Sequence, residues 1–138
     1  MMMKKCIVIT ICLLATLSLF SQVWEYTLNS SNAFNSIRDV EPTNDGGCLL
    51  IGSTGPAGWN TPKQIQLIKL DTDGQEQWVS QLGDPQLGSW HGGRIDQSSS
   101  GEFAFVGTNG SFVVVFKLDN QGNVLWISNI GLSSWNWD

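Results

Sequence analysis

Apolar residues gather in short runs along the chain, and each run is bounded by glycine, proline, asparagine or aspartate. Short apolar runs between turn residues are typical of β-strands. Residues 112–116 are β-branched or aromatic, which predicts a central strand covered on both faces, and residues 64–70 are its counterpart. No stretch after residue 22 shows a helical period with caps. The expected strands lie near residues 37–42, 48–53, 64–70, 76–82, 93–97, 102–108, 111–118 and 124–130.

Three of the turns between these runs have a sequence that explains their shape. Asp45 is followed by two glycines, which supply the positive φ angles that a tight hairpin needs. Residues 71–74 and 119–122 each begin with aspartate and end with glycine. Such an aspartate can accept hydrogen bonds from backbone amides two residues on, while the glycine takes the left-handed conformation. We therefore expect hairpins at all three places.

The expected strands belong to two copies of one repeat. Residues 69–83 match residues 117–131 at an offset of 48, and residues 40–52 match residues 95–107 at an offset of 55. The difference of 7 predicts an inserted loop within residues 53–64, which hold two glycines and two prolines. Each copy then contains four strands. A period near 50 residues with several strands and a recurring tryptophan is typical of β-propeller blades.

Residues 1–22 have the pattern of a secretory signal peptide, with two lysines, then an uncharged apolar run over residues 6–20, then Ser21 and Gln22. The run of about 15 residues is shorter than the roughly 20 that a membrane-spanning helix needs. We expect cleavage after Ser21 and no membrane span afterwards; a retained membrane anchor is the alternative. The expected location is outside the cell or at the bacterial cell surface.

The repeat resembles the β-propeller repeats of large secreted bacterial proteins, many of which carry a C-terminal sorting domain for type IX secretion. A strand ending in Gly52 or Gly107, a strand ending in Lys-Leu-Asp, a turn glycine and a tryptophan carry this resemblance. The Leu-Asp-x-x-Gly-x-x-x-Trp part is also similar to the tryptophan-docking motif of pyrroloquinoline-quinone-type propellers. The residues that match it are Leu70, Asp71, Gly74 and Trp78 in one copy and Leu118, Asp119, Gly122 and Trp126 in the other.

The resemblance implies an all-β fold of antiparallel four-stranded blades, in which each repeat tryptophan packs between neighbouring blades. Trp24 stands where Trp78 and Trp126 stand, so residues 23–28 are expected to be the last strand of a preceding blade. The blades are expected over residues 37–82 and 93–131, within a repeat segment spanning 22–138, and residues 132–138 would start a further blade. The resemblance does not imply the quinone cofactor, because no set of cofactor ligands is present.

Propellers close with about 4–8 blades, and two blades leave two outer faces bare. We therefore expect the chain to be the N-terminal fragment of a larger protein, with further blades of the same longer chain as partners. The second explanation is a ring formed by copies of the chain itself. A monodisperse monomer in light scattering would exclude the ring, and an in-frame continuation of the gene with more repeats would show the fragment.

Composition and charge narrow the function. The 138 residues are 14% charged, against about 25% in an average protein, and include 7 tryptophans. The net charge of -5 becomes -7 once the signal with its two lysines is removed, which disfavours nucleic acid as a partner. Only Cys48 of the three cysteines remains, so the mature chain forms no internal disulfide, and its apolar surroundings in sequence favour a buried small hydrophobe.

Candidate chemistry is sparse. Asp71, Asp73 and Gly74 are similar to half of a calcium loop, but a full loop needs more oxygen ligands, and Asp73 is replaced by Gln121 in the second copy. His91 is the single histidine, and neither a zinc site nor a general base can be assembled around it from recognisable partners. We therefore expect no catalysis, no cofactor and no metal.

The tryptophans outside the repeat are candidate ligand contacts, because loop aromatics on a rigid scaffold can form binding surfaces. They are Trp59, Trp90, Trp135 and Trp137. The alternative is that they pack against a neighbouring blade. The expected function is an exported, non-catalytic binding or scaffold module with a protein or glycan ligand. A carbohydrate-binding propeller that uses loop tryptophans, and part of a quinoprotein-like enzyme, are the alternatives.

Overall fold

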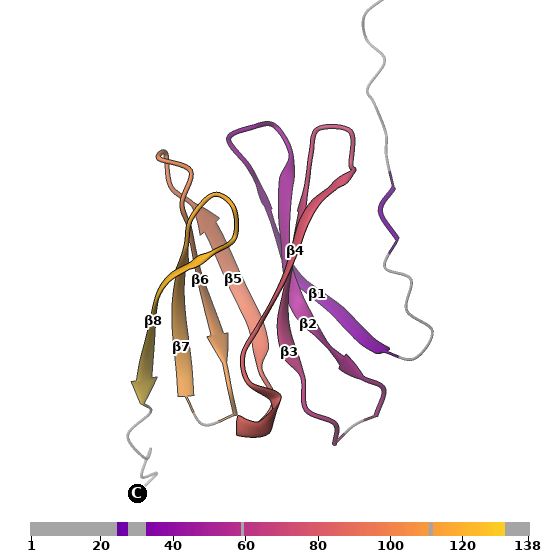
Figure 1. Ribbon diagram of the computed structural model, residues 1–138, viewed down its shortest axis with the longest axis vertical. Helices are drawn as coiled ribbons and strands as arrows, with labels where there is room; N and C mark the ends of the chain where they lie inside the picture. Colours follow the sequence, from indigo (N-terminus) through magenta and orange to yellow (C-terminus); the bar gives the residue numbers. More distant parts are fainter. Residues whose placement is uncertain (1–24, 28–32, 59, 111, 132–138) are drawn as a thin grey trace, which may run out of the picture.

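The computed structural model describes residues 25–27, 33–58, 60–110 and 112–131. This part of the chain contains eight strands and one short 3-10 helix, η1 (Figure 1). The elements are β1 (Ala33–Pro42), β2 (Cys48–Pro56), β3 (Gln64–Leu70), β4 (Glu76–Leu82), η1 (Pro85–Leu87), β5 (His91–Gln97), β6 (Phe103–Thr108), β7 (Phe112–Leu118) and β8 (Val124–Gly131).

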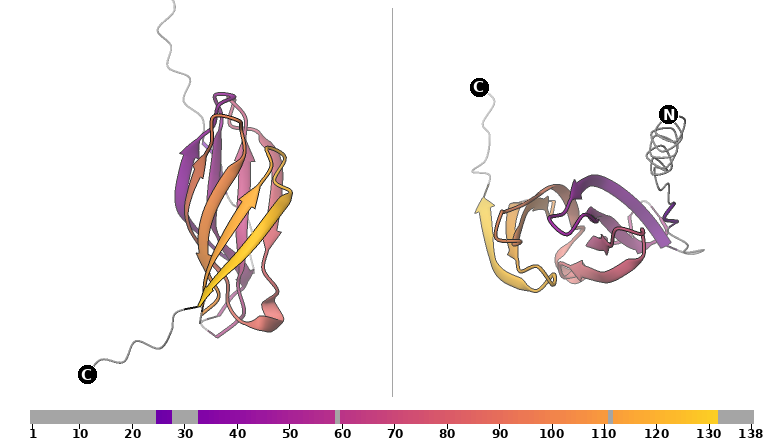
Figure 2. Two further views of the ribbon diagram at one scale, coloured as in Figure 1. Left: turned by 90° about the vertical axis from the view of Figure 1, so that its left-hand side faces the viewer. Right: turned by 90° about the horizontal axis from the view of Figure 1, so that it is seen from above.

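The strands form two antiparallel four-stranded sheets, and each follows chain order, β1-β2-β3-β4 and β5-β6-β7-β8. The two sheets lie side by side with η1 in the connection between them, and β8 is at the side of the second sheet away from the first (Figures 1 and 2). The all-β prediction and the division into two four-stranded units are thus confirmed. The first strand begins at Ala33, four residues before the expected start at residue 37.

The repeat offsets seen in the sequence hold in the backbone pairing. Ile37 pairs with Gly52 in the first sheet, and Gly92 pairs with Gly107 in the second, which is an offset of 55 on both strands. Lys69 pairs with Trp78, and the equivalent pair follows at an offset of 48. In each of these strand pairs the register shift begins directly after the equivalent residue of the repeat.

The expected turns are present, but in the β1–β2 turn only Gly46 has a positive φ, of 84°, and the expectation of a positive φ at Gly47 is wrong. In the β3–β4 turn, Asp71 Oδ1 accepts hydrogen bonds from the backbone N–H groups of Asp73 and Gln75, at 2.9 and 2.8 Å. The equivalent Asp119 accepts the same two bonds in the β7–β8 turn. The glycines that close the two turns have φ angles of 74° and 82°, a conformation that glycine adopts without steric cost. The aspartate and glycine of the repeat are therefore turn residues.

The two sheets pack face to face around one apolar core. Phe105 and Phe116 stack in its middle, with ring centroids 4.6 Å apart. Its buried members are Leu49, Ile51, Ile65, Leu67, Trp90, Ile95, Phe103, Phe105, Val114, Phe116 and Leu118.

The two middle strands of the repeat differ in how far they are covered. β3 buries residues on both faces, since Leu67 on one side and Ile68 on the other are fully buried. On β7, Val114 and Phe116 are buried, but Val113 and Val115 on the opposite face are only half-buried. The expectation of coverage on both faces of residues 112–116 is therefore wrong, because among the described residues no second layer packs there.

A tryptophan pins the connection between the sheets. The Trp90 indole N–H donates to the Asp84 carbonyl at 2.8 Å, and its backbone N–H donates to the Lys63 carbonyl at 2.8 Å. A Cβ at Gly83 would lie 2.4 Å from the ring, so only glycine allows this contact. The polar groups of the connection are thus paired while the ring enters the core.

Several expectations fall outside the described residues. These are the signal peptide over residues 1–21, Trp24, and the start of a further blade over 132–138. Of the strand expected over residues 23–28, residues 25–27 are described and belong to neither sheet. The Tyr26 hydroxyl donates to Glu76 Oε2 at 2.8 Å. Within the described ranges, no helix has the length and apolar character needed to cross a membrane.

Candidate functional site

Each sheet has one face that carries the repeat tryptophan, Trp78 in the first sheet and Trp126 in the second, and we call this side the Trp face. In the first sheet the Trp face is turned toward the second sheet. The Trp78 ring meets Phe103 edge-on, with centroids 6.5 Å apart. It also covers Gly122, where an added Cβ would lie 2.8 Å from the ring. The repeat tryptophan of one sheet therefore packs on the turn glycine of the next.

The rest of the Trp face of the first sheet is filled in the same way. The side chains that alternate with the outward ones on β2 and β3 are fully buried against the second sheet: Leu49, Ile51, Ile65 and Leu67. Fully burying one such side chain stabilises the fold by roughly 1.5–3 kcal/mol. This face is thus a structural interface.

The Trp face of the second sheet has the same pattern but lies open. Trp126 pairs with Lys117 in the same register as Trp78 with Lys69, yet it is 47% exposed. Val106 and Ile130 on this face are also exposed. In the described part of the chain no sheet covers Trp126, so its packing against a neighbouring blade stays a prediction. Large exposed apolar patches on a protein are often interaction sites.

The first strands of the two sheets are linked by polar contacts. The Asp39 carboxylate on β1 accepts a hydrogen bond from the Ile95 backbone N–H at 3.1 Å and pairs with the Arg94 guanidinium at 3.3 Å. Ser53 Oγ lies 3.2 Å from His91 Nδ1. These contacts seat β5 along the β1–β2 side of the first sheet.

A groove of about 710 Å³ lies on the corresponding side of the second sheet. It contains both arginines and the single histidine of a chain that is acidic overall. Arg38 makes no ion pair within the described ranges. The residues that line the groove are Arg38, His91, Gly92, Gly93, Arg94, Val106, Gly107 and Thr108. The groove adjoins the open Trp face, because Val106 belongs to both.

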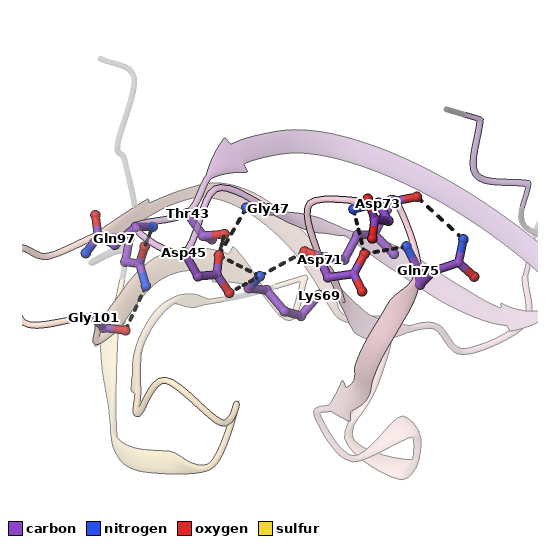
Figure 3. Close-up of polar contacts among 11 residues, drawn as sticks. Thr43, Asp45, Gly47, Lys69, Asp71, Asp73, Gln75, Gln97 and Gly101 are labelled. Carbon is purple, nitrogen blue, oxygen red and sulfur yellow. Dashed lines mark hydrogen bonds and ion pairs between the residues drawn. The ribbon is translucent and has the colours of Figure 1, made fainter. Parts of the chain in front are cut away.

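An ion pair between the buried Lys69 and the half-exposed Asp45 closes one end of the sheet interface (Figure 3). Lys69, whose side chain is 4% exposed, donates to both Asp45 carboxylate oxygens at 3.0 and 2.8 Å and to the Leu70 carbonyl. Asp45 also accepts from the Thr43 hydroxyl and the Gly47 backbone N–H. The hydrogen bond from Lys69 is the main reason that the pKa of Asp45 falls from 3.8 to about 2. Asp45 is therefore charged at any physiological pH.

Lys117 occupies the same repeat position in the second sheet, but its side chain is 33% exposed and pairs with Glu102 at 2.8 Å. This hydrogen bond lowers the pKa of Glu102. The lysine of the repeat thus has a carboxylate partner in both copies. Its burial depends on whether another sheet covers it.

Asp71 and Asp73, the weak candidates for a calcium site, lie in the β3–β4 turn. Asp71 uses its carboxylate to accept backbone N–H groups, and the Gln75 amide donates to the Asp73 carbonyl (Figure 3). In the described part of the chain no three residues of the types His, Cys, Asp and Glu come together as a metal site.

Of the four candidate ligand-binding tryptophans, only Trp90 is described. It is 8% exposed and packs edge-on against Phe116, with centroids 6.4 Å apart. The structure therefore places Trp90 in the core, as the packing alternative has it. Trp59, Trp135 and Trp137 lie outside the described residues.

His91 and Cys48 have different surroundings in the described part of the chain. His91 faces Ser53 and lines the groove. Cys48 is half-buried and not buried as expected, and this partial burial raises the pKa of its thiol, which disfavours the reactive thiolate.

The sequence analysis predicts neither the contacts of Asp39 nor the groove that is lined by both arginines. The offset of 55 contains the signal that could have found them, because it aligns Arg94 with Asp39. Two oppositely charged residues at one repeat position suggest a contact between copies. A second such link joins the turns, where the Asn44 backbone N–H donates to Gln97 Oε1 at 2.7 Å.

Comparison with protein-family models finds no match for the chain, and comparison with curated proteins finds no similar one. The assignment of a function therefore rests on the surfaces described above.

Proposed function

We propose that this chain is an exported, non-catalytic binding or scaffold module built from β-propeller blades, and that its working surface is the open Trp face of the second sheet. The pattern of residues 1–22 supports export. The two sheets of four antiparallel strands, with matching registers and a face-to-face core, support the blade assignment.

One observation carries the proposal. Trp78 and Trp126 have the same register and the same position in the repeat motif, but only Trp78 is covered by a following sheet in the described part of the chain. A face that is a tight interface in one copy and is bare in the next copy is suited to bind another blade of the same kind. The partner of this module is therefore a further blade, supplied by a longer chain or by another molecule.

The test compares serine substitutions at the two tryptophans and at Ile130, at low protein concentration. Trp126→Ser and Ile130→Ser are expected to lower the binding of a hydrophobic dye such as bis-ANS. They should change the free energy of unfolding by less than about 1 kcal/mol, because both side chains are exposed. Trp78→Ser, the matched control, is expected to lower stability much more.

The proposal is wrong if Trp126→Ser destabilises the chain as much as Trp78→Ser and leaves dye binding unchanged. That result would mean that the Trp face of the second sheet is packed in solution and is part of the core.

A further inference from the structure

The groove on the second sheet occupies the position that, on the first sheet, is filled by β5. Gly92 of β5 lies against Ile51 and Gly52 of the first sheet, and a Cβ added at Gly92 would be 2.6 Å from the Ile51 side chain. Ser53 meets His91 beside it. Residues 51–53 correspond to residues 106–108 at the offset of 55, and all three of the latter line the groove. The groove is thus the equivalent of an occupied strand seat.

The charge at this seat is reversed between the two sheets. On the first sheet the seat presents Asp39, and the entering strand β5 brings Arg94. On the second sheet the seat presents Arg94, because Arg94 stands at the repeat position of Asp39. In the first copy of the repeat, the strand equivalent to β5 is β1, and the residue of β1 equivalent to Arg94 is Asp39. A β1 strand entering the groove would therefore bring a carboxylate to an arginine.

The corresponding surface of β1 is open to such a contact. Ile95 of β5, which packs into the core, is 5% exposed, whereas Val40 at the same repeat position of β1 is 52% exposed. Ile37, the equivalent of Gly92, is exposed as well. On the same face, Ile68 and Leu70 of β3 are fully buried and Val79 of β4 is 42% exposed, so the face is open at its β1 and β4 ends.

We propose that a second copy of this chain seats its β1 strand in the groove of the second sheet, where its Asp39, which pairs with Arg94 of its own chain, also faces Arg94 of the first copy. The contact is heterologous, since the two surfaces are different, and such contacts build rings or open chains of subunits. This inference rests on the proposed function, because it names the partner of the same face.

The experiment is sedimentation velocity on the purified full chain over a concentration series. The wild-type chain is expected to associate as concentration rises. Asp39→Arg and Arg94→Asp should each weaken association at least about tenfold, because each places like charges together at the seat. An equimolar mixture of the two variants should restore association, since the arginine introduced in one variant then meets the aspartate introduced in the other. Asp73→Arg, which makes the same charge change in the β3–β4 turn, is the control and should associate like the wild type.

Folding of every variant is checked by circular dichroism. Arg94 tolerates change because its side chain is 89% exposed. If Asp39→Arg does not fold, Arg94→Lys decides, since it should keep association while Arg94→Asp loses it. A wild-type chain that stays monomeric, variants that associate normally, or a mixture that fails to recover would each overturn the inference. The proposed function is judged separately by dye binding and unfolding at low concentration, so its failure is distinguishable.

Discussion

Trp78 and Trp126 are the same residue of the same repeat in two different environments. Their strands pair in the same register, follow the same aspartate turn and share the same register shift. One ring packs on Phe103 and Gly122, and the other is half exposed. The comparison shows that the repeat sequence determines the strand and the turn, whereas the contribution of the tryptophan to stability depends on the neighbouring sheet.

The two lysines of the repeat also differ in burial, and each is paired with a carboxylate. Lys69 is buried and needs Asp45, whereas Lys117 is partly exposed and pairs with Glu102. A buried ammonium without a counter-ion is costly, while an exposed pair contributes little. When another sheet covers the lysine of the repeat, the stability of the fold therefore depends on its carboxylate partner.

The largest expected effect is the difference between Trp78→Ala and Trp126→Ala. Loss of Trp78 leaves a gap between Phe103 and Gly122 and should lower the free energy of unfolding by about 3 kcal/mol. Loss of Trp126 should cost less than about 1 kcal/mol. Denaturant titration measures both. Equal losses would contradict the different roles of the two faces.

The next effect separates the two ion pairs. Asp45→Ala leaves the buried Lys69 ammonium with the Leu70 carbonyl and should cost about 2 kcal/mol at neutral pH. Glu102→Ala is the matched control and should cost much less, because the pair it removes is exposed to solvent. Both values come from thermal or chemical unfolding at pH 7, and a larger loss for Glu102→Ala would reverse the comparison.

The pH dependence of this effect follows from the lowered pKa of Asp45. Because the folded-state pKa is about 2 and the ordinary value is 3.8, the contribution is present above about pH 4 and is lost as the pH falls toward 2. Glu102 and Asp119 also have lowered pKa values. The informative quantity is therefore the stability gap between wild type and Asp45→Ala, which should narrow between pH 4 and pH 2.

The smallest expected effect concerns the glycine under Trp78. Gly122→Ala forces an alanine into a φ of 82° and pushes its Cβ against the Trp78 ring. Gly110→Ala has nearly the same φ, 79°, but meets no atom within 4 Å, so it isolates the backbone cost of roughly 1 kcal/mol. Gly122→Ala should cost about 1 kcal/mol more than Gly110→Ala. Equal costs would mean that the ring does not rest on Gly122.

The strands and turns were accessible from the sequence because they depend on local signals. The short apolar runs, the turn residues between them and the repeat offsets together predict eight strands and the aspartate turns. All of these are present. The exposure of Trp126 and the open face of β7 do not follow from these local signals, although a count of two blades already implies bare outer faces. Burial of a residue depends on whether another sheet lies over it, and the repeat motif is the same in both cases.

The candidate surface was predictable only in part. The tryptophan-docking motif pointed to contacts between blades, but the link from Asp39 to Arg94 joins residues 55 positions apart and depends on how the two sheets pack. Trp90 was a candidate ligand contact because it lies between the two copies in sequence. It is buried because the connection folds back and pairs with Lys63.

The outermost described strand of the second sheet has a consequence for handling the protein. β8 is an edge strand with Val124, Leu125 and Ile127 exposed, and its eight residues include no lysine or proline. Edge strands without such residues readily add a strand from another molecule through their free backbone groups. In concentrated stocks this edge is therefore where irreversible aggregation should start, and a lysine placed at Leu125 or Ile127 is the natural way to obtain a preparation that stores well.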